Sequence, residues 1–129
     1  MISHSAYFGD SVRAFTLTDT IIEELQHKTG LGIGALFLRM SSSQFRVADI
    51  VEVIRLGLVG AGTSPVEAQR LVDAYAKDRP FDETFPLALD ILDARWNGKP
   101  DNSQDELRQA AATGDMGAAI NESLKEAGL

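Results

Sequence analysis

The sequence predicts a mainly α-helical protein: an N-terminal β-hairpin, about five packed helices, and a flexible or weakly helical C-terminal tail. Apolar residues alternate with period two near the N-terminus, recur at helical spacing from Thr18 to Trp96, and become sparse after Trp96. We therefore expect residues 1–98 to form a single helical domain that includes the hairpin. Residues 99–129 are polar, and we expect them to be mobile or to become ordered on a partner.

The hairpin is indicated by residues 6–17, which read AYFGDSVRAFTL. Two short apolar stretches flank Gly9 and Asp10, a pair that is typical of tight hairpin turns. Because an isolated two-stranded hairpin is only marginally stable in water, it must pack on the helices or pair with another strand. Its free edges are therefore a candidate docking site.

The first helix is predicted from the spacing of apolar residues after the hairpin. It can begin with Thr18 or Asp19 as its N-cap, or with a capping box made by Thr20 and Glu23. Gly30 ends it, because glycine readily adopts the left-handed conformation found just after many helices.

Four more helices follow from the same apolar spacing, at residues 32–40, 47–59, 65–77 and 82–97. The second helix of the chain is short and mostly apolar, so we expect it to be central. Pro86 is tolerable in the last helix if it lies in the first turn, where backbone N–H groups have no partner inside the helix.

A cluster of glycines lies between two of these helices, in the stretch GLVGAGTSPVEAQRL at residues 57–71. The glycine order G-x-x-G-x-G is the reverse of the dinucleotide fingerprint, and no Lys-Ser or Lys-Thr pair follows as in a P-loop. Instead, Gly60 or Gly62 can end one helix, while Ser64 and Glu67 can form a capping box for the next. This interpretation needs no nucleotide or other cofactor.

Two helices joined by a glycine turn also allow a helix-turn-helix, whose second helix would read DNA. Five basic residues between 46 and 79 are, however, matched by five acidic ones, and the whole chain has a net charge of −7. A surface that neutralises phosphates needs an excess of positive charge. We therefore expect no binding to nucleic acid or to an anionic membrane surface.

The inventory of catalytic groups is small, so we expect no enzymatic activity. The two histidines are His4, near the N-terminus, and His27, near a helix C-terminus where a surface cation is favourable. No cluster with metal-ligand spacing is visible, and the chain has no cysteine. With no signal-peptide pattern and no apolar run of membrane-spanning length, a soluble cytoplasmic protein is expected.

The aromatic residues divide into two groups. Four lie on or beside apolar helix faces, which favours core packing: Phe37, Phe45, Phe85 and Trp96. Contacts with another chain are expected instead from apolar residues of the hairpin edge and the tail. These candidates are Tyr7, Phe8, Val12, Leu107, Ile120 and Leu124.

From about Phe8 to Gly98 the chain resembles the gene-transfer-agent family of small phage-tail proteins. This family is related to the tail assembly chaperones of long-tailed phages and is sometimes labelled as tail tube proteins. Four segments carry the resemblance through their order and spacing: KTG, VADIVEVIRLGLVGAG, SPVEAQRLVDAY and RPFDETFPLALDIL. Trp96 follows the last of them and completes the pattern.

The resemblance implies a non-enzymatic role in tail morphogenesis, with no catalytic residues to transfer. Related chaperones bind the tape measure protein while tail tube protein assembles around it, so both proteins are implied partners. Two alternatives stay open: a structural tail tube subunit, and a helix-turn-helix regulator. Tube subunits usually need a substantial β-sheet to close a ring, which favours the chaperone, and a homo-oligomer is compatible with either tail role.

Overall fold

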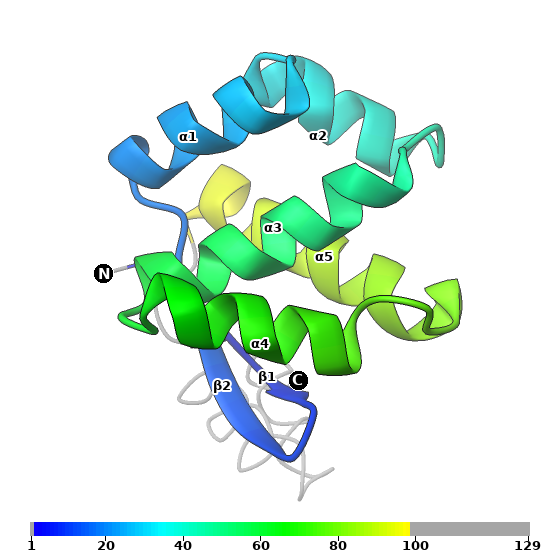
Figure 1. Ribbon diagram of the computed structural model, residues 1–129. Helices are drawn as coiled ribbons and strands as arrows, with labels where there is room; N and C mark the ends of the chain where they lie inside the picture. Colours follow the sequence, from blue (N-terminus) through cyan, green and yellow to red (C-terminus); the bar gives the residue numbers. More distant parts are fainter. Residues whose placement is uncertain (1, 99–129) are drawn as a thin grey trace, which may run out of the picture.

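The computed structural model describes residues 2–98, which form an antiparallel hairpin followed by five helices (Figure 1). The fold class predicted for this part of the chain is confirmed. The predicted C-terminal tail lies outside the described residues. The elements are β1 (His4–Phe8), β2 (Ser11–Phe15), α1 (Asp19–Thr29), α2 (Ile33–Ser41), α3 (Val47–Gly60), α4 (Pro65–Tyr75) and α5 (Phe81–Asn97).

The hairpin turns at Gly9 and Asp10, as predicted, with Gly9 at a φ of 72°. The register places Tyr7 opposite Val12, and Phe8 opposite Ser11. Because successive side chains of a strand point to opposite faces, one face of the hairpin turns toward the helices and the other turns outward.

Helix α3 lies at the centre of the molecule and contacts α1, α4, α5 and β2 (Figure 1). Seven of its 14 residues are buried. The expectation that α2 would be central is wrong: α2 contacts only the neighbouring α1 and α5 substantially, and its buried residues are Leu36 and Met40. Helix α3 is the longer of the two, with 14 residues against nine, and it has seven buried residues where α2 has two.

The helix boundaries follow local capping chemistry. The Thr18 hydroxyl accepts a hydrogen bond from the Ile21 N–H group at 3.2 Å, so Thr18 is the N-cap of α1. The Ser64 hydroxyl accepts one from the Glu67 N–H group at 3.2 Å, which confirms the predicted start of α4. The carboxylate of Glu67, however, accepts its hydrogen bonds from Arg70, so the reciprocal half of that capping box is replaced by an ion pair.

Two expectations about helix ends are wrong. Helix α4 ends at Tyr75 and not at Lys77. Helix α5 begins at Phe81, so Pro86 lies in its second turn, beyond the first-turn positions that lack a hydrogen-bonding partner. At that position the proline removes one backbone hydrogen bond of the helix.

The three glycines of residues 57–62 have two different structural roles. Gly57 and Gly60 lie on the face of α3 that meets the chain leaving β2, and the Gly57 carbonyl accepts a hydrogen bond from the Thr16 N–H group at 2.9 Å. Helix α3 continues through Gly60, and Gly62, at a φ of 114°, forms the turn after it. The prediction of a helix junction is confirmed: Gly60 is the last residue of α3, and it also packs closely against Thr16.

The described residues contain no helix that is both long enough and apolar enough to cross a membrane.

Candidate protein-binding surfaces

The outward face of the hairpin presents the first candidate surface. Tyr7 and Val12 are directly opposite cross-strand partners, and their exposed fractions are 69% and 68%. Ser5 and Ala14 form the next pair along the same face. Two large apolar side chains thus stand side by side in solvent, and their part in protein binding stays a prediction.

Phe8 was predicted to belong to this surface, and that prediction is wrong. Only 6% of Phe8 is exposed, and its ring meets those of Phe15 and Tyr75 edge to face, with centroids 5.9 and 6.0 Å apart. Since neighbouring strand residues point to opposite faces, Tyr7 and Phe8 cannot both face outward. The alternation of side chains along the strand therefore predicts that only one of these two residues can belong to the outward face.

Three further predicted contact residues, Leu107, Ile120 and Leu124, lie outside the described residues. Their part in binding stays a prediction.

A cleft of about 690 Å³ lies beside the hairpin, where β1 faces α4 and α5. Its lining includes Tyr7 and Tyr75 together with charged groups that already have partners. The Arg79 guanidinium binds the Glu83 carboxylate at 3.0 Å, and His4 Nε2 lies 4.0 Å from an Asp90 oxygen. The cleft extends the hairpin surface toward α5 and carries charges of both signs.

Trp96 marks a second apolar surface, which sequence reasoning missed. The structure leaves 55% of Trp96 exposed, so its assignment to the core is wrong. Its ring stacks on the ring of Phe37, with centroids 4.5 Å apart and planes 11° from parallel. Trp96 lies in the last turn of α5, and Phe37 of α2 covers one side of its ring.

The remaining aromatic residues cluster around the first turns of α5. Phe45 stacks on Phe85 at 4.8 Å, and both rings are partly buried against the core, in agreement with their predicted packing. Phe81 meets Phe45 edge to face at 6.1 Å and is more than half exposed. This cluster closes the bundle beside the loop that follows α2.

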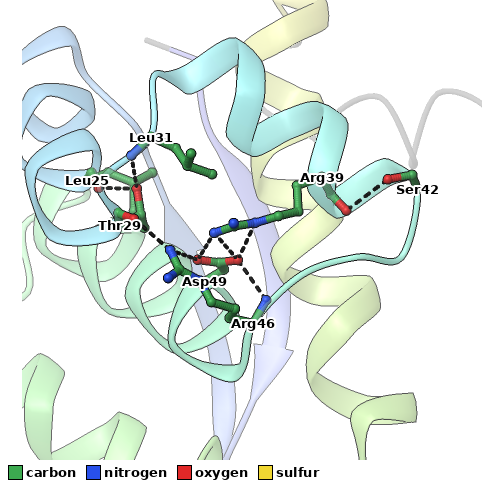
Figure 2. Close-up of polar contacts among 7 residues, drawn as sticks. All are labelled: Leu25, Thr29, Leu31, Arg39, Ser42, Arg46 and Asp49. Carbon is green, nitrogen blue, oxygen red and sulfur yellow. Dashed lines mark hydrogen bonds and ion pairs between the residues drawn. The ribbon is translucent and has the colours of Figure 1, made fainter.

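The most elaborate polar arrangement surrounds the buried carboxylate of Asp49 (Figure 2). The Arg39 guanidinium donates from Nε to Oδ2 at 3.1 Å and from Nη2 to Oδ1 at 3.0 Å. The backbone N–H group of Arg46 donates to Oδ2 at 2.8 Å. Both carboxylate oxygens are therefore satisfied by the protein itself.

The same arrangement continues into α1, as Figure 2 shows. The Arg46 side chain donates to the Thr29 carbonyl at 2.7 Å, and the Thr29 hydroxyl donates to the Leu25 carbonyl at 2.9 Å. Three helices are joined in this way around one charge. We conclude that Asp49 positions α1, α2 and α3, and does not offer a free oxygen to a ligand.

Titratable groups with shifted pKa values lie in surface ion pairs. A hydrogen bond from Arg13 lowers the pKa of Asp10, hydrogen bonds from Arg70 lower the pKa of Glu67, and a hydrogen bond from Lys77 lowers the pKa of Asp73. These shifts report local pairing. Within residues 2–98, no group of three or more His, Cys, Asp or Glu side chains could hold a metal ion.

Comparison with known proteins gives no match among curated proteins or solved structures. The sequence profile of one family does match residues 1–98, and this family is described as "Phage tail tube protein, GTA-gp10". The match covers the hairpin and all five helices of the described structure. The chain therefore belongs to the GTA-gp10 phage tail protein family.

Proposed function

We propose that this protein is a non-enzymatic tail assembly chaperone that binds the tape measure protein in the cytoplasm while the tail tube assembles. Membership of a phage tail protein family supports a role in tail morphogenesis. The single observation that carries the binding proposal is the exposed pair of Tyr7 and Val12 on the outward face of the hairpin.

The hairpin suits binding to another chain for two reasons. Burial of Tyr7 and Val12 against an apolar partner would remove them from water, which is favourable by about 25 cal/mol for each Å² of apolar surface. The described sheet has only two strands, so each strand also has one edge without a neighbouring strand. Such an edge can offer backbone hydrogen bonds to an extended segment.

A chaperone is favoured over a tube subunit by the small extent of the sheet. Within residues 2–98 the sheet consists of β1 and β2 alone, whereas tube subunits usually need a substantial β-sheet to close a ring. The net charge of −7 also favours a soluble, dispersed protein over polymerisation.

A DNA-binding role is disfavoured by the charges of α4, the helix that would enter the groove. Arg70 pairs with Glu67, and Lys77 just beyond the helix pairs with Asp73 at 2.8 Å. A phosphate would have to compete with these carboxylates, and their own charges would repel it.

Co-expression of the full chain with a fragment of a tape measure protein tests the proposal. We expect the double substitution Tyr7→Ser and Val12→Ser to reduce the soluble yield of the fragment, while the thermal midpoint of the chaperone stays the same. Val66→Ser is the control, because Val66 is 82% exposed and belongs to α4, not to the hairpin. Equal yields for the wild type and the double variant would refute the hairpin as the binding surface.

The predicted contribution of the tail is tested in the same assay by serine substitutions at Leu107, Ile120 and Leu124. Electron microscopy of the purified full chain then separates the two tail roles. A tube subunit should polymerise into rings or filaments of the chain alone, whereas a chaperone should form no such polymer.

A further inference from the structure

The cleft beside the hairpin runs along the free edge of β1. Four of the five residues of β1 line it, and the opposite wall consists chiefly of residues from α4 and α5. An exposed edge strand can take up an extended segment of another chain as an additional strand. The inference that follows rests on the proposed function, and it concerns the conformation and the side chains of the segment that is bound.

The backbone of β1 offers the polar groups that such a segment needs. In a hairpin with a two-residue turn, the pair next to the turn exchanges hydrogen bonds, and every second pair after it does so. The register therefore turns the N–H and C=O groups of Ser5 and Tyr7 away from β2. These groups have no backbone partner among the residues that the structure describes. Two donors and two acceptors are thus available at the free edge of β1.

The two edges of the sheet differ in charge and in what lies beside them. Strand β1 contains no Asp, Glu, Lys, Arg or Pro, the residues that commonly protect an edge strand from pairing. Strand β2 carries Arg13, whose guanidinium binds Asp10 at 3.0 Å, and the chain after β2 is held on α3 through Thr16. The edge of β1, with the cleft beside it, is therefore the better site for a third strand.

The wall opposite β1 determines which side chains fit the cleft. Glu83, Leu87 and Asp90 line it from α5, and their spacing of four and three residues places them on one face of the helix. Arg79 neutralises Glu83. The side chain of Asp90 is 58% exposed, and it lies 4.0 Å from His4, which is charged only when protonated. This wall suits an apolar side chain at Leu87 and a basic one at Asp90.

We propose that the cleft binds an extended segment of a partner chain, which pairs with β1 as a third strand. An apolar side chain of this segment contacts Leu87, and a lysine or arginine side chain pairs with Asp90. A second copy of this chain matches the cleft less well, because its own β1 contains no lysine or arginine and the net charge of −7 opposes the association of two copies.

Backbone hydrogen exchange of the full chain, followed by nuclear magnetic resonance, tests the added strand. The probe is a synthetic peptide with blocked ends and the sequence Thr-Lys-Thr-Val-Thr-Lys-Thr, in millimolar excess. We expect exchange of the Ser5 and Tyr7 N–H groups to slow by about ten-fold or more. The N–H groups of their cross-strand partners, Ala14 and Val12, lie at the other edge and should not change. The same peptide with all its backbone amides methylated is the control, because it keeps the charge but has no N–H donor.

A pair of variants tests the charge of the cleft. We expect Asp90→Asn to weaken binding of the peptide about three-fold, as for a partly exposed ion pair. Asp82→Asn is the matched control, because it removes the same charge from α5 at a residue that does not line the cleft. We expect it to leave the binding constant unchanged.

Three outcomes would overturn the proposal. The first is unchanged exchange of the Ser5 and Tyr7 N–H groups in the presence of the peptide. The second is an equal effect of the two asparagine variants, since the peptide would then respond only to the overall charge. The third is protection of both N–H groups in the chain alone, and its loss on dilution would identify a second copy as the occupant.

The peptide experiment and the chaperone assay can fail separately. A tape measure fragment that stays soluble without protection of the Ser5 and Tyr7 N–H groups would refute the third strand alone. Protection by the peptide without any effect on the soluble yield of the fragment would refute the chaperone function and leave the strand-binding cleft.

Discussion

Gly60 of α3 lies so close to Thr16 that a Cβ atom at position 60 would overlap the Thr16 carbonyl oxygen. One turn earlier, the Gly57 carbonyl accepts the hydrogen bond of the Thr16 N–H group. The chain that leaves the hairpin is therefore held against the backbone of the central helix at two points. This contact fixes the position of the hairpin, and with it the outward face that carries Tyr7 and Val12.

We expect Gly60→Ala to lower the free energy of unfolding by about 2 kcal/mol, because the added methyl group forces Thr16 away from α3. Gly34→Ala in α2 is the matched control, since nothing lies within 4 Å of a Cβ atom there. The control should stabilise the protein by up to about 1 kcal/mol through helix propensity. Urea unfolding measures both values, and equal effects of the two substitutions would contradict the packing role of Gly60.

The glycine stretch also shows how far the sequence alone can predict this fold. The end of one helix and the capped start of the next were predictable, because turn glycines and Ser64 act on their own neighbours in the chain. The contact of Gly60 with Thr16 was not, because it joins residues that are far apart in the sequence. Helix caps and turns depend on residues that are close in the sequence and can be predicted from them, whereas close packing depends on the arrangement of the whole bundle.

The candidate surfaces show the same division. Tyr7 and Val12 were predicted correctly as exposed, and Phe8 could have been excluded by applying the period of the strand strictly. Trp96 follows the apolar spacing of α5, but it lies in the last turn of the helix and is 55% exposed. Helical periodicity indicates which face of a helix is apolar, and not how much of its length another helix covers.

Gly62 should be sensitive to substitution for a reason different from that of Gly60. Its φ of 114° is rarely adopted by residues with a side chain, although the space around it is open. We expect Gly62→Ala to cost about 1 to 2 kcal/mol of stability through backbone strain alone. Thermal unfolding measures this loss. Titration with nucleotide or DNA should give no binding for the wild type or the variant, and binding lost in the variant would revive the phosphate-cradle interpretation.

The ion pair of Asp49 and Arg39 should contribute much more than the other ion pair of α3. Asp49→Asn keeps the shape of a buried side chain but leaves Arg39 and Arg46 without their counter-charge. We expect a loss of about 3 kcal/mol of stability. Glu52→Gln, which breaks the pair with Arg55 within α3, is the control and should cost less, because the Glu52 side chain is 22% exposed whereas that of Asp49 is fully buried. If chemical denaturation gave similar losses for Asp49→Asn and Glu52→Gln, burial of Asp49 would add nothing to the effect of its ion pair on the free energy of unfolding.

Stability should decrease in acid because surface carboxyl groups have lowered pKa values in the folded chain. The Arg13 guanidinium lowers the pKa of Asp10 from its ordinary value of 3.8, and Arg70 lowers that of Glu67 from 4.5. A lowered pKa stabilises the fold above the unfolded value, and this contribution disappears as the pH falls through the folded value. We expect the midpoint temperature of thermal unfolding to decrease when the pH is lowered below about 4. Asp10→Asn should flatten this decline, and an unchanged decline would exclude Asp10 as a contributor.

The tip of the hairpin should depend on the contact between Gly9 and Tyr75. Gly9 and Gly30 have nearly equal left-handed conformations, with φ values of 72° and 76°, but only Gly9 has a neighbour. A Cβ atom at Gly9 would lie 2.5 Å from the Tyr75 ring, whereas one at Gly30 would meet nothing within 4 Å. Because asparagine tolerates this conformation, both asparagine variants carry a similar backbone cost. We expect Gly9→Asn to lower the free energy of unfolding by about 1 to 3 kcal/mol more than Gly30→Asn in urea titrations. Equal losses would show that Tyr75 moves aside freely and does not hold the hairpin against α4.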